Sequence, residues 1–208
     1  MARGQGPRSA ALDLVGRLNR ATGKREGGIV GLNSLRVADA DRALSELLSG
    51  DVAQMQNYLR RKLRDRRFDS VVRSAIREGR SVPAKQARKI IDRLRERSLF
   101  QRGETIARTE LLPSLHSAQD EGLRQLIDGG KLQASQIKET WDASEDDDTR
   151  DSHRAMDGQS VYFGQPFVTG NGHRLRYPGD RSLGAPAEEI INCRCRKVID
   201  IDHLAGIQ

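Results

Sequence analysis

Hydrophobic residues in the first half of the chain recur at helical spacing, in segments separated by glycine, serine and proline. Ser34 is a plausible cap for the first helix, which Gly50 ends. Asp51 can cap a second helix, and its apolar pattern continues to Gly79. The apolar positions are Leu35, Ala38, Leu44, Leu47, Leu48, Val52, Met55, Leu59, Leu63, Val71, Val72, Ala75 and Ile76. The spacing predicts that the second helix is amphipathic, with a basic outer face.

Two further helices are predicted between residues 81 and 130. Ser81-Val82-Pro83 is a start signal, with serine as the cap and proline in the first turn. The first of these helices is expected to end at Gln101-Arg102-Gly103, and residues 104–128 are expected to form a second one. Pro113 lies inside that second helix, so we expect it to kink or split the helix.

The pattern changes after Gly130 to short segments of mixed type. Residues 136–141 alternate as a strand does, and turn residues are frequent from there to the end of the chain. The expected pieces are a short helix through Met156, extended pieces at 161–168, turns at 170–172 and 178–180, a helical turn at 186–191 and a strand at 194–201. The fold class is therefore α+β: a helical, basic N-terminal half followed by a small α+β C-terminal module with short strands.

We divide the chain into three regions on this basis. Residues 1–33 are rich in glycine and are expected to be a flexible arm with one or two helical turns. Residues 34–100 form the basic helical region, and residues 101–208 form the C-terminal module.

Composition narrows the class of protein. The chain has 208 residues, of which 36% are hydrophobic and 4% aromatic, so its core must consist of aliphatic side chains. No run approaches ~18 apolar residues, which excludes a transmembrane helix. The first residues contain no apolar signal-peptide region, and two cysteines make no disulfide framework. We expect a soluble, intracellular protein without membrane association.

The net charge of +7 conceals a division between the halves. Residues 1–100 carry a net charge of +12, whereas residues 101–208 carry −5. Between Arg60 and Arg97 there are 15 basic and 5 acidic residues, which favours a polyanion or an acidic protein surface as the partner. The residues expected to make this contact are Arg60, Arg61, Lys62, Arg64, Arg66 and Arg67. A solvated helix face is the alternative interpretation. Tyr58 lies just before the run and Phe68 within it, and we expect both to pack in a core rather than stack on bases.

Four short segments of the C-terminal half form a set over residues 101–199: Ile106-Ala107-Arg108-Thr109-Glu110, Lys138 through Trp141, Asp148 through Asp157-Gly158, and Tyr177-Pro178-Gly179-Asp180 followed by Asn192-Cys193-Arg194-Cys195. In content and order this set resembles the phage Mu F-like minor head protein family, which acts in head morphogenesis of tailed phages. The residues that we take as its structural signature are Arg108, Glu110, Trp141, Asp157, Gly158 and Asn192.

This resemblance implies a non-enzymatic minor head protein located in the virion, inside the head and near the portal, after assembly in the host cytoplasm. The implied partners are the portal protein, major capsid or scaffold proteins, and packaged double-stranded DNA, which the basic helices would contact without sequence specificity. Such a protein assists head assembly and the organisation or delivery of the packaged DNA.

Cys193 and Cys195 are the sharpest local chemical feature. Two thiolates and an imidazole can bind Zn²⁺, and His153 is the natural third ligand. A fourth ligand is not obvious, although Asp151, Asp157 and His173 are candidates. We favour the simpler interpretation, in which the thiols are reduced core residues and the protein needs no cofactor.

Asp146, Asp147 and Asp148 allow a second functional interpretation. Clustered carboxylates can hold metal ions around a phosphate, so a metal-dependent nuclease or an injected effector using Asp148, His153, Cys193 and Cys195 is the alternative function. We expect instead that these carboxylates cap the short helix that follows them. A third possibility is a plain nucleic-acid-binding host protein.

Overall fold

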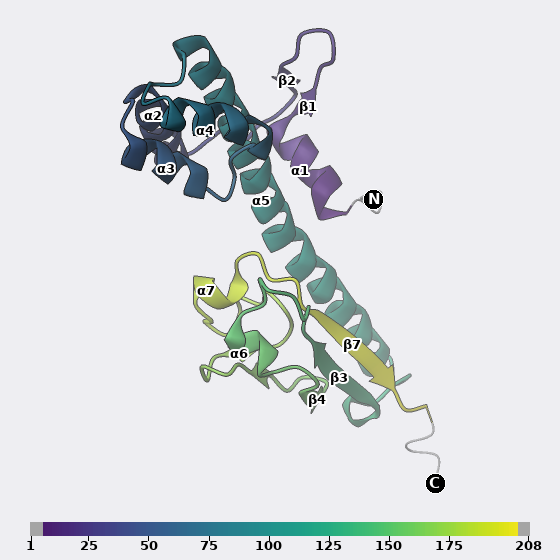
Figure 1. Ribbon diagram of the computed structural model, residues 1–208. Helices are drawn as coiled ribbons and strands as arrows, with labels where there is room; N and C mark the ends of the chain where they lie inside the picture. The colour runs from purple at the N-terminus through teal and green to yellow at the C-terminus, as the bar shows by residue number, and fades with distance from the viewer. Residues whose placement is uncertain (1–5, 204–208) are drawn as a thin grey trace. The chain divides into compact units, whose positions relative to one another are not determined.

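The computed structural model describes residues 6–203 and divides the chain into two compact units (Figure 1). The first unit is Met1–Glu104 and the second is Thr105–Gln208. Helix α5 (Ala84–Asp128) contributes residues to both units, and each unit is described by itself below.

The first unit is a small helical bundle. It contains α2 (Ser34–Leu48), α3 (Val52–Arg60), the 3₁₀ turn η1 (Arg66–Phe68), α4 (Asp69–Arg77) and the first part of α5. Asp51 caps α3 as predicted, because its side chain accepts a hydrogen bond of 2.8 Å from the Gln54 amide. Asn33, rather than Ser34, caps α2. The apolar faces of these helices pack together in one core. It consists of Ala40, Ala43, Leu47, Met55, Tyr58, Val72, Ala75, Val82, Ala87, Ile90, Ile91 and Leu94.

The beginning of the described chain has more regular structure than the sequence indicated. Where a flexible arm was expected, the structure has α1 (Pro7–Val15) and a hairpin of β1 (Arg17–Leu18) and β2 (Arg25–Glu26). The glycines here permit close backbone approach: a Cβ on Gly28 would lie 2.4 Å from the carbonyl carbon of Val15. Glycine content thus marks contact here, and not only flexibility.

Helix α5 is continuous over 45 residues, so the predicted break at Gln101-Arg102-Gly103 is wrong. A Cβ on Gly103 would lie 2.6 Å from Val15 Cγ1 and 3.1 Å from the Ala11 carbonyl oxygen. Gly103 therefore serves close packing of α1 on α5, and this tertiary contact outweighs the weak helix propensity of glycine. Pro113 does not split the helix either. Despite its length, α5 is not apolar enough to cross a membrane, and neither is any other helix within residues 6–203.

The second unit combines small antiparallel sheets with short helices, so the predicted α+β class is confirmed. Strand β3 lies between β4 and β7, and β5 pairs with β6. The elements are η2 (Ala134–Gln136), β3 (Ile137–Asp142), α6 (Asp151–Arg154), β4 (Ser160–Tyr162), β5 (Phe167–Val168), β6 (Arg174–Leu175), α7 (Ala187–Ile190) and β7 (Arg196–Ile201).

One face of the three-stranded sheet is buried and contains a cluster of charges. Alternation along β3 buries Ile137, Glu139 and Trp141, and Trp141 pairs with Lys197 across the strands. The Lys197 ammonium lies 2.6 Å from Glu139 Oε1 and also pairs with Asp120 of α5. The Lys197 side chain is fully buried, so its ammonium group has lost its hydration. The ion pairs with these two carboxylates compensate for that loss. The cluster joins the sheet to α5.

Candidate functional site

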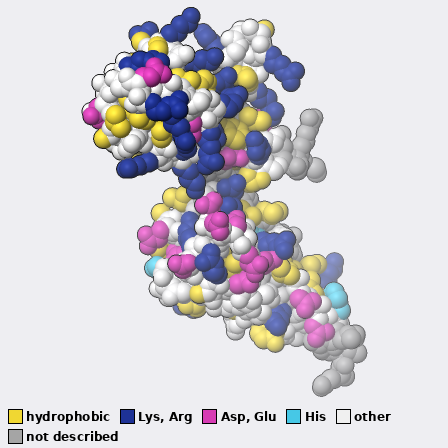
Figure 2. All heavy atoms as spheres, in the orientation of Figure 1, with side chains coloured by type: hydrophobic (Ala, Val, Ile, Leu, Met, Phe, Trp, Pro, Cys, Tyr) yellow, Lys and Arg dark blue, Asp and Glu magenta, His cyan; other side chains and the backbone are white. Residues whose placement is uncertain are grey.

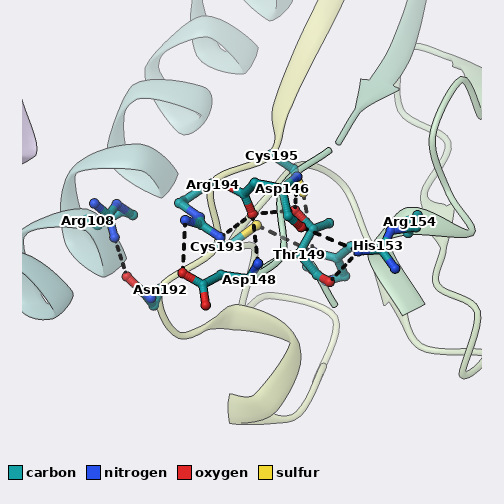
Figure 3. Close-up of polar contacts among 10 residues, drawn as sticks. All are labelled: Arg108, Asp146, Asp148, Thr149, His153, Arg154, Asn192, Cys193, Arg194 and Cys195. Carbon is teal, nitrogen blue, oxygen red and sulfur yellow. Dashed lines mark hydrogen bonds and ion pairs between the residues drawn. The ribbon is translucent and has the colours of Figure 1, made fainter. Parts of the chain in front are cut away.

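The signature segments, which are far apart in the sequence, come together in the second unit (Figure 3). Arg108 Nη1 donates a hydrogen bond of 2.6 Å to the side-chain oxygen Oδ1 of Asn192. The backbone N–H of Asn192 donates one of 2.9 Å to the Thr109 hydroxyl oxygen. Asn192 has a φ of 59°, a left-handed conformation that asparagine tolerates better than most residues. Glu110, next along α5, accepts a hydrogen bond from Arg181. The helix segment therefore positions the loop that carries both cysteines.

Two signature residues after α6 close the end of β3. Asp157 Oδ1 accepts a hydrogen bond of 2.8 Å from the Ala143 amide, and the Gly158 amide donates one of 2.9 Å to the Trp141 carbonyl. Gly158 has a φ of 73°, which favours glycine. Trp141 is fully buried, as expected for a core anchor. Asp157 and Gly158 therefore fix the end of β3, the strand from which Trp141 enters the hydrophobic core of the unit.

The acidic loop before α6 is organised around Asp146. Asp146 Oδ1 accepts hydrogen bonds from the Asp148 amide at 3.1 Å and the Thr149 hydroxyl at 3.0 Å. The same oxygen lies 2.5 Å from Arg194 Nη2, and Asp148 Oδ2 lies 3.6 Å from Arg194 Nη1 (Figure 3). Helix α6 has Arg150 at its N-cap and no side-chain cap, so the expected capping by these carboxylates is wrong. They shape a turn and bind an arginine, because the turn places them before the cap position.

His153, Cys193 and Cys195 form one buried cluster. His153 lies on α6, and the two cysteines lie in the loop that enters β7. The Cys193 sulfur is 3.6 Å and the Cys195 sulfur 3.5 Å from the same atom, His153 Nδ1. The His153 ring packs edge-on against Trp141, with ring centroids 5.3 Å apart. All three residues are buried, and both thiols are free.

Sequence reasoning missed Glu189, which supports this cluster. Glu189 Oε2 lies 3.1 Å from His153 Nε2 and accepts a hydrogen bond of 2.8 Å from the Ser152 hydroxyl. Its other oxygen accepts one of 3.0 Å from Asn171 and lies 3.1 Å from His173 Nδ1. Burial would raise the pKa of Glu189, but the hydrogen bonds from Ser152, His173 and Asn171 outweigh it and lower the pKa. Glu189 is thus a buried, ionised carboxylate, and no sequence motif identified it.

The pKa values of the two thiols are shifted in opposite directions. The hydrogen bond with Cys193 lowers the pKa of the Cys195 thiol to about 5, against the opposing effect of burial, and His153 adds to the lowering. The same hydrogen bond and burial raise the pKa of Cys193. Cys195 is therefore the more acidic of the two thiols, and the thiolate is the form that binds metals.

The other candidate ligands from the sequence lie outside the cluster. The Asp151 carboxylate is 99% exposed and pairs with Arg154. Asp157 holds the Ala143 amide, and His173 contacts Glu189. Among the described residues, only His153, Cys193 and Cys195 bring potential metal-ligating atoms within 4.8 Å of one another in a group of three or more.

The six residues expected to form the basic contact divide into two groups. Arg61 binds Glu46 and Asp39, and Arg64 binds Asp69, with each arginine side chain only 14–15% exposed. Arg60, Lys62, Arg66 and Arg67 are exposed, and Arg67 also pairs with Asp65. Arg61 and Arg64 therefore hold the helices of the first unit together, whereas the other four lie on its surface.

The aromatic residues beside the basic run are packed, as expected. Tyr58 is fully buried in the core of the first unit, and burial raises its pKa to about 12. Phe68 packs against the same core. Neither side chain offers a platform for a base.

An arginine-rich groove in the first unit was not predicted from the sequence. Lysine and arginine side chains are numerous on the face of this unit seen in Figure 2. The groove has a volume of about 630 Å³, and its lining includes Arg8, Arg25, Arg67, Arg93, Arg97 and Phe100. The guanidinium groups of Arg8 and Arg25 lie 5.4 and 5.9 Å from the Phe100 ring centroid. Arg8 and Arg25 come from the region expected to be a flexible arm, so the chain offered no local signal that they join this groove.

Comparison with known proteins supports the resemblance seen in the sequence. A family model described as Phage Mu protein F like protein matches residues 66–198. The match begins upstream of residue 101, so it includes α4 and all of α5. No curated protein and no solved structure matches the chain.

Proposed function

Since the chain belongs to the Phage Mu protein F like family, and is by that membership a phage head morphogenesis protein, we propose that it is a non-enzymatic minor head protein that contacts packaged DNA and the portal. Family membership supports a place in the virion. The observation that carries the DNA contact is the concentration of exposed arginine and lysine on the first unit, together with its arginine-rich groove.

The chemistry of this surface suits the phosphates of double-stranded DNA. Arginine forms paired hydrogen bonds with phosphate oxygens, and such contacts carry no sequence information. The groove also contains Asp65, Glu96 and Glu104, which pair with or offset some of its arginines. A surface of this mixed kind favours contacts that form and release as DNA moves, and it is sensitive to salt.

The second unit is the proposed attachment module. Its signature residues are used inside the unit, where they position the loop at Asn192 and the end of β3. We assign this unit to contacts with the portal and with major capsid or scaffold proteins inside the assembling head, in the host cytoplasm.

The proposal of a non-enzymatic role also rests on the acidic loop. The carboxylates of Asp146 and Asp148 are directed to Arg194, and neither belongs to the His153, Cys193 and Cys195 group. A nuclease needs carboxylates that share a metal ion around a phosphate. A plasmid-nicking assay with Mg²⁺, Mn²⁺ or Zn²⁺ tests this point; cleavage that is lost in His153→Ala would favour the nuclease instead.

The DNA contact is tested by binding to double-stranded DNA over a range of salt concentrations. We expect the logarithm of affinity to fall linearly with the logarithm of salt, and the slope to decrease by about one for each phosphate contact removed. The variant R60E/R66E/R97E reverses three exposed arginines of the first unit and is expected to lose most binding. R174E reverses an exposed arginine of the second unit and is the matched control. Equal retention of all three proteins on DNA in low salt would refute the DNA contact.

The attachment role needs a separate measurement. Co-expression of the chain with the portal protein of its own phage, followed by co-sedimentation, is expected to show a complex that R60E/R66E/R97E still forms. A complex that this variant loses while R174E keeps it would assign the basic surface to the portal rather than to DNA.

A further inference from the structure

Two sulfur atoms and one ring nitrogen meet at a single buried point in the second unit. Cys193 Sγ and Cys195 Sγ lie 3.6 and 3.5 Å from His153 Nδ1. In a tetrahedral zinc site, bonds of about 2.3 Å to sulfur and about 2.0–2.1 Å to nitrogen place those two ligand atoms about 3.5–3.6 Å apart. Both observed separations have this value.

Hydrogen bonding alone accounts for only part of this arrangement. A neutral imidazole nitrogen without a proton has one lone pair, and it can accept one S–H donor well. Here two sulfurs approach the same nitrogen at almost equal distances, so a hydrogen bond from one of them leaves the approach of the other unexplained. A cation between the three atoms satisfies all of them at once.

The surroundings of His153 are those of a metal ligand. Its other nitrogen, Nε2, faces Glu189 Oε2 at 3.1 Å, and both side chains are 1% exposed. In metal sites, a carboxylate that faces the far nitrogen of a histidine commonly orients the ring, with the near nitrogen directed to the metal. Glu189 is itself held by Ser152, Asn171 and His173, so its position is determined by three further side chains.

We propose that His153 Nδ1, Cys193 Sγ and Cys195 Sγ bind one zinc ion. Two thiolates and one imidazole are a soft, nitrogen-containing ligand set, which selects zinc over magnesium or calcium. Both cysteines bind the ion as thiolates, and the thiol protons pass to solvent as the metal enters. This inference stands apart from the proposed head function, since it rests on side chains that the DNA contact does not use.

The fourth ligand is a water molecule. A small cavity of about 10 Å³ adjoins the cluster, and His153, Cys195, Ser144, Thr149 and Asn192 are among its lining residues. A cavity of about 10–15 Å³ on this measure holds one water, and the polar lining here offers it hydrogen bonds.

The ion would stabilise the second unit. Its hydrophobic core consists of Trp141, Ala143, Met156, Phe167, Leu175, Cys193 and Cys195. Because both cysteines belong to this core, an ion bound by them and by His153 would cross-link it from within. Zinc at this point joins α6 directly to the loop that enters β7.

The test is the zinc content of the untagged full-length chain, purified without chelator and dialysed against metal-free buffer. We expect about one zinc per chain in the wild type. Cys193→Ser and Cys195→Ser are expected to lose zinc to background, whereas His203→Ala, a histidine outside the cluster, is expected to keep it. Zinc retained by the double variant C193S/C195S would overturn the assignment.

A second measurement does not depend on whether the cysteine variants fold. The metal-free wild type is titrated with Co²⁺, which takes the same site and reports thiolate ligands by near-ultraviolet absorption and tetrahedral geometry by visible absorption. Zinc is expected to abolish both signals, and Glu189→Gln is expected to weaken metal binding about 10–100-fold without changing the spectrum. Zinc at background together with no Co²⁺–thiolate absorption in the wild type would refute the site.

Discussion

Arg108 Nη1 donates a 2.6 Å hydrogen bond to Asn192 Oδ1 across 84 positions of sequence. The contact joins the signature segment of α5 to the loop that carries Cys193 and Cys195. Two segments that look like separate motifs in the sequence are therefore parts of one structural unit.

Two substitutions of Asn192 distinguish the stability contributed by its side-chain hydrogen bond from the cost of its left-handed backbone conformation. Asn192→Ala loses the hydrogen bond to Arg108 and places alanine at a φ of 59°, whereas Asn192→Gly loses only the hydrogen bond. We expect the alanine variant to lower the free energy of unfolding by about 1–2 kcal/mol more than the glycine variant, because a left-handed conformation costs that much for a residue with a Cβ. Urea unfolding measures both; equal losses would mean that the backbone at Asn192 is not strained.

Gly103 and Gly122 are a matched pair on one helix. Gly103→Ala places a methyl group 2.6 Å from Val15 Cγ1, so we expect a loss of about 1–3 kcal/mol from overpacking between α1 and α5. A Cβ on Gly122 would point into open space, and Gly122→Ala is expected to stabilise α5 by about 0.5–1 kcal/mol. Thermal unfolding of the two variants should shift in opposite directions. Stabilisation by Gly103→Ala would show that α1 does not pack against this residue.

Asp65 makes the first unit sensitive to acid. Hydrogen bonds from the Arg67 side chain, against the opposing effect of burial, lower the pKa of the Asp65 carboxyl from 3.8 to about 2. A carboxyl whose pKa is lower in the folded state stabilises the protein above its unfolded pKa, and this contribution is lost as the pH falls from about 4 to about 2.

The test of this linkage is unfolding of Asp65→Asn at several pH values. We expect the variant to be less stable than the wild type at pH 7 and to lose less stability between about pH 4 and about pH 2. Asp41→Asn is the control, since Asp41 forms an exposed ion pair with Arg95. Parallel pH profiles for the wild type and Asp65→Asn would contradict the assignment.

Lys197 holds two buried carboxylates. Lys197→Met keeps much of the side-chain volume but leaves Asp120 and Glu139 without their cation, so we expect a loss of about 3–5 kcal/mol in the free energy of unfolding. Adding Asp120→Asn and Glu139→Gln removes the unpaired charges and is expected to restore part of that loss. A triple variant no more stable than Lys197→Met would show that volume, and not charge, dominates at this position.

The helical elements were largely predictable because their signals are local. Gly50 and Asp51 mark the end of one helix and the start of the next, and the structure has α2 and α3 there. The strand predicted at residues 136–141 corresponds to β3. Gly103 was misinterpreted because helix propensity is a weak preference, and packing against α1 outweighs it. The β1–β2 hairpin was missed because each strand has only two residues.

The candidate sites were predictable only in part. The spacing of Cys193 and Cys195 and the position of His153 suggested a cluster, and the structure brings all three together. Glu189 gave no signal, since a single glutamate in an acidic half of the chain looks like a surface residue. Arg61 and Arg64 were grouped with the exposed arginines, because sequence does not distinguish an arginine held by an internal carboxylate from one that faces solvent.

The sequence by itself determined the α+β class, the charge division between the halves and the family to which the chain belongs. These depend on composition, on periodicity and on the order of short motifs, all of which are visible along the chain before it folds. Only the tertiary structure decided that Arg108 binds Asn192, that Glu189 faces His153 and that Lys197 is buried between two carboxylates. Such contacts join residues far apart in the chain, and their energies depend on burial and distance, which appear only when the chain has folded.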